Sequence, residues 1–297
     1  REEVKFKLDE TGKPLGVYFK EQKESNQMIE EFMLLANRRV AEFCGKRKTD
    51  KGRTVERPMV YRVHDSPSEE KLDRFRQFIL RFGHIFKATK GRAVAKELNK
   101  LFAQIKGTTE ENAVSTMAVR SMAKAYYTTD NIGHYGLAFP YYTHFTSPIR
   151  RYPDTSIHRI LSDLVAGTDQ TTLKKRYGEF ATLSAAESSK TEVRAVTGER
   201  SAEDCYIAEY MKAHLGERHM GIISGVTPKG IFVKLENNAE GFVSLNDFEN
   251  CEFEYDGEVS HRDLRSGRVL MMGEEIGIIV AAADVATGRV DFMPQEP

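Results

Sequence analysis

The sequence predicts an α+β protein in which a mostly helical part, residues 1–214, precedes a small β-barrel, residues 215–297. Apolar residues recur every three to four positions in several segments of the first part, whereas the second part contains five short apolar strands separated by turns. The charge changes at the same place. The first part carries 37 lysines and arginines against 29 acidic residues, and the second carries 7 against 15. The basic first part therefore suits a nucleic acid, and the acidic second part does not.

A β-hairpin is predicted where the chain begins. Val4–Leu8 alternates apolar and polar residues, a turn follows at Asp9–Pro14, and Leu15–Lys20 alternates again. A two-stranded ribbon is barely stable alone. We therefore expect the hairpin to belong to a larger domain, of which a preceding segment is missing.

The clearest helix is predicted at Gln27–Phe43, where apolar residues fall on one face. Lys46–Arg57 is a basic loop, and is either a solvated connection or a rim that contacts phosphates. Met59–His64 is predicted as a short strand. Further helices are predicted at Ser68–Phe82, Arg92–Ile105, Asn112–Ala125, Ser156–Val165 and Glu179–His214. The last of these contains no proline, is interrupted only by a glycine, and should be about 50 Å long.

Five strands are predicted in the second part: Met220–Ser224, Ile231–Leu235, Gly241–Leu245, Glu274–Val280 and Arg289–Met293. Five short strands in so few residues are typical of the five-stranded OB-fold barrel. The acidic run from Glu249 to Glu258 is predicted to be a solvated loop between strands. Phe232 and Phe242 are the aromatic residues best placed to bind RNA bases, although either could face the core, as half of a strand's positions do.

The densest functional pattern is Gly133–Arg159, GHYGLAFPYYTHFTSPIRRYPDTSIHR. Five aromatic residues lead to a Thr-Ser-Pro corner, and two adjacent arginines follow. Ser147–Pro148 predicts a helix start, whose free N–H groups attract anions. Two interpretations are open. The aromatic residues can be core and the arginines can form surface ion pairs, or the segment can hold a phosphate beside stacked bases.

The same segment resembles the signature of the ribonuclease II/R family, GHFGLA…Y-x-HFTSPIRRYPD-x-x-x-HR, at nearly every position. The barrel pattern G-x-I-x-G-V…G-I-F-V…E-G-F-V-S-L is similar to the RNA-binding OB domain that often closes chains of this family. The resemblance, closest to the ribonuclease R branch, implies the C-terminal part of an RNB-type catalytic domain at 1–214 and an OB domain at 215–297. It also implies a 3′–5′ exoribonuclease that degrades single-stranded RNA processively to nucleoside 5′-monophosphates.

The resemblance also implies roles for individual residues. Arg150 matches the arginine expected at the scissile phosphate, where a guanidinium stabilises charge bidentately. Glu199 aligns with a glutamate of the ribonuclease II branch that assists turnover or product release, at a position where enzymes of the ribonuclease R branch differ. Tyr61 falls where an aromatic residue stacks on the last base, and Glu31 and Asn37 belong to a helix that lines the RNA channel. The other expected RNA contacts in the signature are His144, Thr146, Ser147, Arg151, His158 and Arg159.

Several of these residues could instead have purely structural roles. Glu199 could form a surface ion pair, and Tyr61 could be a half-buried strand residue. The spacing of His144 and His158 is not that of metal ligands, so we expect hydrogen bonds to phosphate or to a helix end. Asp154 could orient Arg151 or His158.

Phosphodiester hydrolysis with two metal ions needs several carboxylates that converge on one point. Acidic pairs occur here at Glu30–Glu31, Glu69–Glu70 and Glu110–Glu111, where they suit helix starts. The resemblance places the aspartate-rich motif that binds Mg²⁺ upstream of this chain, so we expect the chain alone to be inactive. An alternative is an RNA-binding or regulatory module without nuclease activity. A translation-linked OB protein is a third hypothesis, but it leaves the signature unexplained.

The remaining expectations concern location and partners. Cys44, Cys205 and Cys251 lack metal-ligand spacing, which indicates reduced thiols and a cytoplasmic location. No apolar run approaches the ~20 residues that span a membrane, so no membrane partner is expected, and neither a signal nor a transit peptide is predicted. Single-stranded RNA is the expected partner. The exposed half-domain is also expected to associate through unpaired strands.

Overall fold

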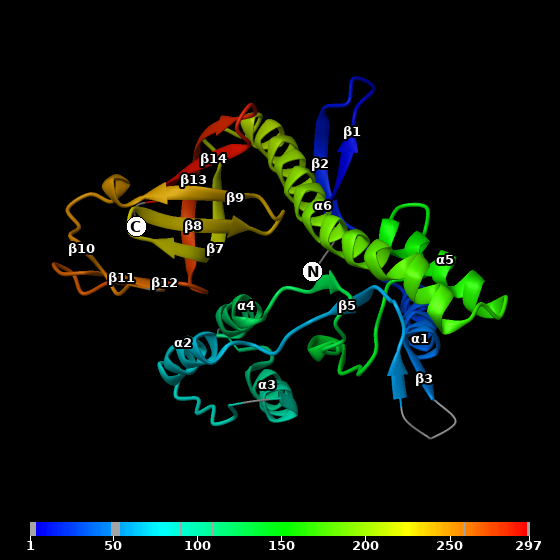
Figure 1. Cartoon of the computed structure of the whole chain (residues 1–297). Helices are drawn as coiled ribbons and strands as arrows, with labels where there is room; N and C mark the ends of the chain where they lie inside the picture. The colour runs from blue at the N-terminus through cyan, green and yellow to red at the C-terminus, as the bar shows by residue number, and fades with distance from the viewer. Residues whose placement is uncertain (1–3, 49–53, 90, 109, 258, 296–297) are drawn as a thin grey trace.

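The computed structural model describes residues 4–48, 54–89, 91–108, 110–257 and 259–295. One long helix, α6 (Gln170–Lys212), runs from the helical part of the molecule to the barrel (Figure 1). It begins nine residues before the predicted start, because the side chain of Asp169 accepts hydrogen bonds from the N–H groups of Thr171 and Thr172. Gly198 does not interrupt it, so its 43 residues span about 64 Å.

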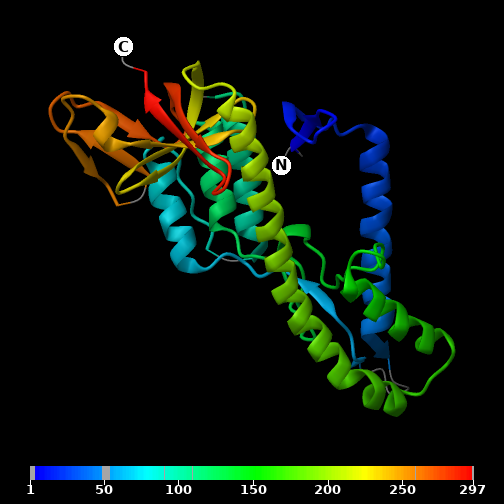
Figure 2. The ribbon, with the colours of Figure 1, turned by 90° about the horizontal axis from the view of Figure 1, so that it is seen from above.

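The predicted hairpin is confirmed as β1 (Val4–Leu8) and β2 (Pro14–Phe19), which pair antiparallel. The helix that follows, α1 (Glu24–Gly45), agrees with the predicted helix. Seen from above, α1 and α6 meet near α5 and diverge from it, and the hairpin lies toward the end of α6 (Figure 2). There Phe6 stacks on Tyr206 of α6, with 5.3 Å between ring centroids.

The predicted basic loop contains a strand pair instead, β3 (Lys46–Lys48) with β4 (Thr54–Glu56), and residues 49–53 lie outside the described residues. The predicted strand at 59–64 is shorter than expected. It is β5 (Tyr61–Val63), and it pairs with β6 (Tyr126–Thr128), a strand that the sequence analysis did not predict.

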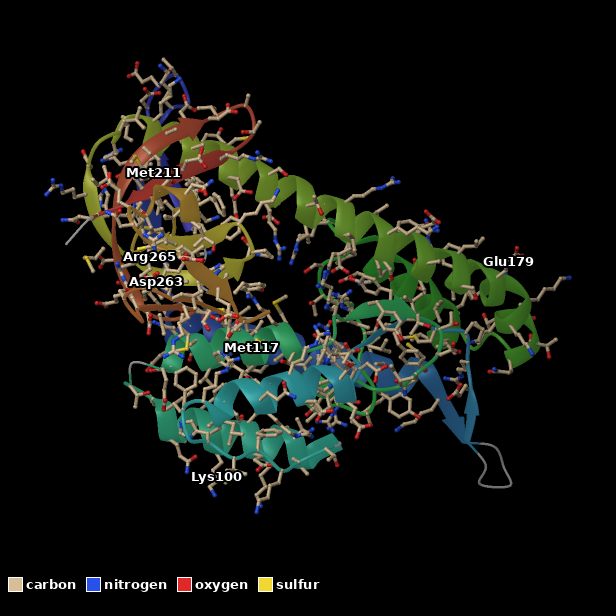
Figure 3. The ribbon with its side chains drawn as sticks, turned by 90° about the vertical axis from the view of Figure 1, so that its left-hand side faces the viewer. Lys100, Met117, Glu179, Met211, Asp263 and Arg265 are labelled. Atoms are coloured by element: carbon tan, nitrogen blue, oxygen red, sulfur yellow. The ribbon has the colours of Figure 1, made fainter. Side chains whose placement is uncertain are left out.

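Three helices form a separate core beneath the barrel: α2 (Glu69–Leu80), α3 (Gly91–Ile105) and α4 (Glu111–Ser121). Helix α4 ends four residues before the predicted end, because Met122 is extended. Val259 and Met272 of the barrel part are buried in the same core. In addition, Arg120 of α4 donates a hydrogen bond to the carbonyl of Ser224 at 3.0 Å. The barrel is therefore packed directly against these helices, and Figure 3 shows Met117 of α4 facing it.

The predicted helix start at Ser147–Pro148 is wrong. A 3₁₀ turn, η1 (Tyr135–Leu137), and an irregular segment precede α5 (Tyr152–Val165). The carbonyl of Ser147 accepts from the N–H groups of Arg150 and Arg151, which makes one isolated turn. The helix itself begins at Tyr152, with Pro153 in its first turn, where a missing N–H costs nothing.

The five-stranded barrel is confirmed. Its closed order is β13-β14-β9-β8-β7. The strands are β7 (Arg218–Thr227), β8 (Gly230–Leu235), β9 (Glu240–Ser244), β13 (Glu275–Asp284) and β14 (Arg289–Pro294). Gly241 permits the close approach of the Phe292 ring, since a Cβ there would lie 2.5 Å from a ring carbon.

The prediction of a solvated acidic loop after β9 is wrong in part. After the short turn η2 (Leu245–Asp247), a three-stranded sheet forms from β10 (Phe253–Tyr255), β11 (Ser260–Asp263) and β12 (Val269–Met271). Phe253 and Tyr255 pack against the buried ring of His261. Phe253, Glu254 and Tyr255 do alternate apolar and acidic residues, but the sequence analysis interpreted the whole acidic run as solvated.

Helix α6 contributes to two hydrophobic cores. Its first turns bury Leu173, Tyr177 and Ala181 against α5, and its last turns bury Ile207, Ala208 and Met211 in the barrel. Figure 3 marks the two ends at Glu179 and Met211. The turns between residues 191 and 202 are largely exposed. Within the described residues, we find no helix with the length and apolar character needed to cross a membrane.

Candidate functional site

The candidate site is built around residues 145–151, which we call the signature loop. It connects a segment beside β5 to helix α5 and has no regular structure beyond the isolated turn. Asn37 of α1 is 3% exposed, and its Oδ1 accepts from the N–H groups of Phe145 and Thr146 at 2.9 and 3.2 Å. Its Nδ2 donates to the Tyr142 hydroxyl at 3.2 Å. Asn37 therefore holds the loop rather than presenting its amide to solvent.

The two adjacent arginines have different environments. The Arg151 guanidinium donates to Oδ1 of Asp154 at 2.7 Å, and Asp154 is completely buried. Of the two partners considered for Asp154, Arg151 and His158, the structure shows the pair with Arg151. The Arg150 side chain is exposed, and it forms no hydrogen bond or ion pair with any residue that the structure describes. Its neighbour Ile149 is fully exposed at the tip of the loop. One arginine is therefore used inside the fold and the other faces solvent.

His158 fixes the start of the loop. Its Nε2 lies 3.0 Å from the carbonyl of Phe145, and its ring stacks on the Phe145 ring at 4.1 Å. The Thr146 hydroxyl is buried and has no hydrogen-bond partner among the described residues. The backbone N–H of Ser147 donates to Asp154 at 2.7 Å. In this structure the contacts of these residues are with the protein, so their predicted contacts with RNA stay proposals.

A cluster of imidazole and phenol rings lies beside the loop. Nδ1 of His144 is 2.7 Å from the Tyr127 hydroxyl, and the Tyr142 ring packs between His134 and His144. Burial lowers the pKa of His144 to about 3, and the positive charges of Arg151 and Arg62 add to the effect. Burial, with the neighbouring His64, lowers the pKa of His134 to about 4. Both histidines are therefore neutral at pH 7 in a positively charged environment.

Arg62 of β5 links this cluster to α6. Its Nη1 is 2.5 Å from Oε2 of Glu192, and its guanidinium lies 4.6 Å from the centre of the Tyr127 ring. The sequence analysis did not identify Arg62, Tyr127 or Glu192. Glu192 follows Arg62 by 130 positions, and no local pattern relates residues so far apart. Tyr142 and His134 lie inside the signature segment, so the sequence analysis could have named them as candidate site residues.

Tyr61 does not have the environment that its predicted stacking role requires. It is 1% exposed, in the core that also contains Cys44 and Ile157. A Cβ on Gly45 would lie 2.1 Å from its hydroxyl oxygen, which shows how closely the phenol is enclosed. Burial raises the pKa of Tyr61. A fully enclosed ring offers no face to an RNA base, so we reassign Tyr61 to the core.

Other predicted residues lie away from the loop. Glu31 is on the exposed first half of α1, and Glu199 is on the exposed middle of α6. Arg159 is on α5 with its guanidinium 5.8 Å from the centre of the Phe180 ring. The structure therefore brings Asn37, His144, Arg151 and His158 together with Arg150. It places Glu31, Glu199 and Arg159 elsewhere.

The two predicted aromatic residues of the barrel lie side by side on its outer surface. The rings of Phe232 and Phe242 are 5.3 Å apart, and the alternation of buried residues along β8 and β9 directs both outward. They line a cleft of about 480 Å³ between the barrel and α6, together with Lys234 and Arg289. The cleft also contains Glu203 and Asp204 of α6, so its charge is mixed.

We tested whether the site could hold the metal ions of a nuclease. Within the described residues, no three or more histidines, cysteines, aspartates or glutamates are grouped as metal ligands would be. Asp154, the buried carboxylate nearest the loop, is already paired with Arg151. The residues described here therefore do not fit a two-metal centre.

Comparison with known proteins identifies two domains. The family model described as the RNB domain matches residues 1–167, and the S1 RNA binding domain matches residues 212–293. The chain is 37% identical over 297 residues to ribonuclease R 1 of Lactococcus lactis and 36% identical to ribonuclease R of Aquifex aeolicus. These matches cover 99% and 98% of this chain but 35% and 40% of the two relatives. The chain thus spans about two fifths of the length of such relatives.

Solved structures show the same fold. Ribonuclease R of Mycoplasma genitalium in complex with ribose-methylated single-stranded RNA has a TM-score of 0.87 at 23% identity, over 99% of this chain and 45% of that one. Yeast Ssd1, a pseudonuclease, has a TM-score of 0.53 at 22% identity, over 88% of this chain and 30% of that one. At these identities the likeness concerns the fold alone. Because the RNB model matches more than half of the sequence, this chain belongs to the RNB family, the ribonuclease II/R family that its signature resembles.

Proposed function

We propose that this chain binds single-stranded RNA as part of an RNB-type 3′–5′ exoribonuclease that releases nucleoside 5′-monophosphates, with Arg150 in contact with the RNA backbone. The supporting observation is the unpaired, exposed guanidinium of Arg150 on the signature loop. A guanidinium binds phosphate oxygens bidentately and stays charged at every physiological pH. The family also includes relatives named ribonuclease R.

Replacing Arg150 by glutamine should weaken the binding of a single-stranded oligonucleotide about tenfold or more, because a hydrogen-bonded charge pair is lost. The slope of log affinity against log salt concentration should also fall by about 0.7, the value for one phosphate of a single strand. Both quantities can be measured by fluorescence anisotropy at several salt concentrations. Arg265→Gln is the matched control, because Arg265 is an exposed arginine at the far end of the barrel part. Equal slopes for the two variants would contradict the proposal.

We also propose that the barrel supplies a second RNA contact. Phe232 and Phe242 lie on adjacent strands with outward-facing rings, and Lys234 lies beside them. Stacking of bases on aromatic rings is tolerant of sequence, as a processive enzyme requires. Glu31, His158 and Arg159 remain proposed contacts for RNA that runs past the signature loop, and Glu199 remains a proposed catalytic residue that assists turnover.

Mg²⁺ is the cofactor that we propose for the complete enzyme, where it would activate water and stabilise charge on the phosphate. The described residues lack a group of carboxylates for it. We therefore expect the purified 297-residue chain not to shorten a 5′-labelled RNA when Mg²⁺ is added. Denaturing gels report the result, with an equal amount of the Arg150→Gln variant as the control for contaminating nucleases. Mg²⁺-dependent shortening by the wild-type chain alone would contradict this prediction.

An RNA-binding module without nuclease activity is the second candidate function. It is favoured by one observation, the shared fold with a yeast pseudonuclease. Both candidate functions include RNA binding. They differ in whether a separate segment supplies the metal-binding carboxylates that the described residues lack. Adding the amino-terminal portion of a ribonuclease R relative to the purified chain distinguishes them, because the enzyme hypothesis expects Mg²⁺-dependent cleavage in the mixture.

Three further proposals concern organisation. We place the boundary between the catalytic part and the barrel after residue 214, just beyond the end of α6. We propose association through the exposed side of the half-domain, where Met28, Ile29 and Phe32 of α1 are each more than half exposed. We also propose a cytoplasmic location, in keeping with three free cysteines.

A further inference from the structure

The signature loop is fixed at nearly every residue except the two at its tip. The Phe145 N–H and carbonyl are bound by Asn37 and His158, and the Ser147 N–H is bound by Asp154. The Pro148 carbonyl accepts from the Thr155 hydroxyl at 2.9 Å. Pro148, Ile149 and Arg150 are the exposed residues of the loop, and the Arg150 side chain forms no hydrogen bond to a described residue.

The two principal anchors come from opposite sides. Asn37 belongs to α1, and Asp154 belongs to the first turn of α5. Each is buried, and each accepts two hydrogen bonds through a single oxygen atom. Buried side chains that accept from backbone N–H groups hold a loop in one conformation, since the alternative leaves polar groups unpaired in the core.

Asp154 also accounts for the different environments of Arg150 and Arg151. By pairing with Arg151, it neutralises that charge inside the loop. The Arg150 side chain is left as the charge that faces solvent, and its position depends on the turn closed by the Ser147 carbonyl. Without Asp154, Ser147 and Arg151 would both lose a partner, and this turn would lose its support on both sides.

We propose that Asn37 and Asp154 are positioning residues for Arg150: they preform the signature loop so that its guanidinium meets an RNA phosphate without a prior rearrangement. This inference rests on the proposed function, in which Arg150 contacts the RNA backbone. Preorganisation raises affinity because the cost of ordering the loop is already met in the free protein. Neither residue touches RNA itself.

The test uses Asp154→Ala in the 297-residue chain, because asparagine would keep an oxygen able to accept both hydrogen bonds. Binding of a single-stranded oligonucleotide is measured across salt concentrations. Simple electrostatics expects tighter binding, because a negative charge is removed. The positioning role expects the opposite: weaker binding and a salt slope lower by about 0.7, as for Arg150→Gln. The double variant Asp154→Ala/Arg150→Gln should bind no more weakly than Arg150→Gln, since coupled residues are not additive.

Asp163→Ala is the matched control. It removes the same charge from the same helix, where Asp163 accepts from Arg176 at 2.5 Å and from the Tyr177 hydroxyl at 2.8 Å, away from the loop. Its RNA affinity should stay equal or increase, with an unchanged salt slope. Asn37→Leu is a second variant, which removes the loop's other anchor and should reproduce the effect of Asp154→Ala. All affinities are measured well below the thermal midpoint of each variant.

The outcomes separate this inference from the proposed function. If Arg150→Gln lowers the salt slope but Asp154→Ala binds as tightly as the wild type, or if the losses of the double variant multiply, the positioning role is wrong and the phosphate contact stands. If Arg150→Gln leaves the slope unchanged, the proposed phosphate contact is wrong, and the positioning role is rejected with it.

Discussion

Replacing Met211 by alanine is expected to lower the free energy of unfolding by about 2–5 kcal/mol. Met211 is fully buried where the last turns of α6 enter the barrel core, among Ile223, Ile278 and Phe292. The alanine would leave a cavity there, because a close-packed core relaxes only partly around a deletion. The value can be measured by urea denaturation followed by circular dichroism.

The matched control for this prediction is Met293→Ala. Met293 lies on β14 of the same barrel but is 48% exposed, so its loss should change stability by less than about 0.5 kcal/mol. Because α6 contributes to the cores at both of its ends, we expect a single unfolding transition for the wild type. If Met211→Ala and Met293→Ala had the same effect, the end of α6 would not anchor the barrel as described.

Acidification is expected to destabilise the protein through His144. The folded-state pKa of His144 is lowered to about 3, chiefly by burial and then by Arg151 and Arg62, whereas the usual value is 6.5. Above pH 6.5 the ring is neutral in both states and costs nothing. Below pH 6.5 the unfolded chain takes up a proton that the folded protein cannot accept. Stability therefore falls by up to about 1.4 kcal/mol per pH unit, until the loss levels off near pH 3.

The variant His144→Gln tests this sign. Glutamine does not titrate, and its amide oxygen can accept from the Tyr127 hydroxyl that faces His144. We expect lower stability than the wild type at pH 7 but a shallower decline between pH 7 and pH 5 in urea denaturation. A second substitution, His134→Gln, should flatten the curve further, since the pKa of His134 is lowered in the same direction. Parallel pH curves for the wild type and His144→Gln would exclude His144 as the source of acid sensitivity.

Sequence patterns correctly predicted the helices and strands that depend mainly on local apolar periodicity. The periodicity of Gln27–Phe43 corresponds to α1, and the five apolar strands after residue 215 form the barrel. In contrast, the start of α5 was misplaced. Ser147–Pro148 has the composition of a helix start, but the N–H of Ser147 is bound by a side chain seven residues later. Such a hydrogen bond depends on the folded path of the loop, so residue composition does not predict it.

The signature located the candidate site without a structure, since its residue types are adjacent in the chain. The different roles of the residues within the signature, however, are set by tertiary contacts. Adjacent arginines look equivalent in sequence, yet Arg151 pairs with a buried carboxylate and Arg150 faces solvent. Tyr61 was expected at a base and is enclosed in a core, because burial depends on what packs over a strand and not on the strand alone.

The sequence by itself therefore determined the family, the order of a helical part and a barrel, and the segment that carries the candidate site, because these depend on periodicity and on a contiguous motif. The tertiary structure alone decided which of those residues face solvent and which are paired inside the fold. Asn37, Arg62 and Glu192 reach the site from elements far apart in the chain, and their distances are set by packing. Exposure and pairing are properties of that packing, so no local pattern encodes them.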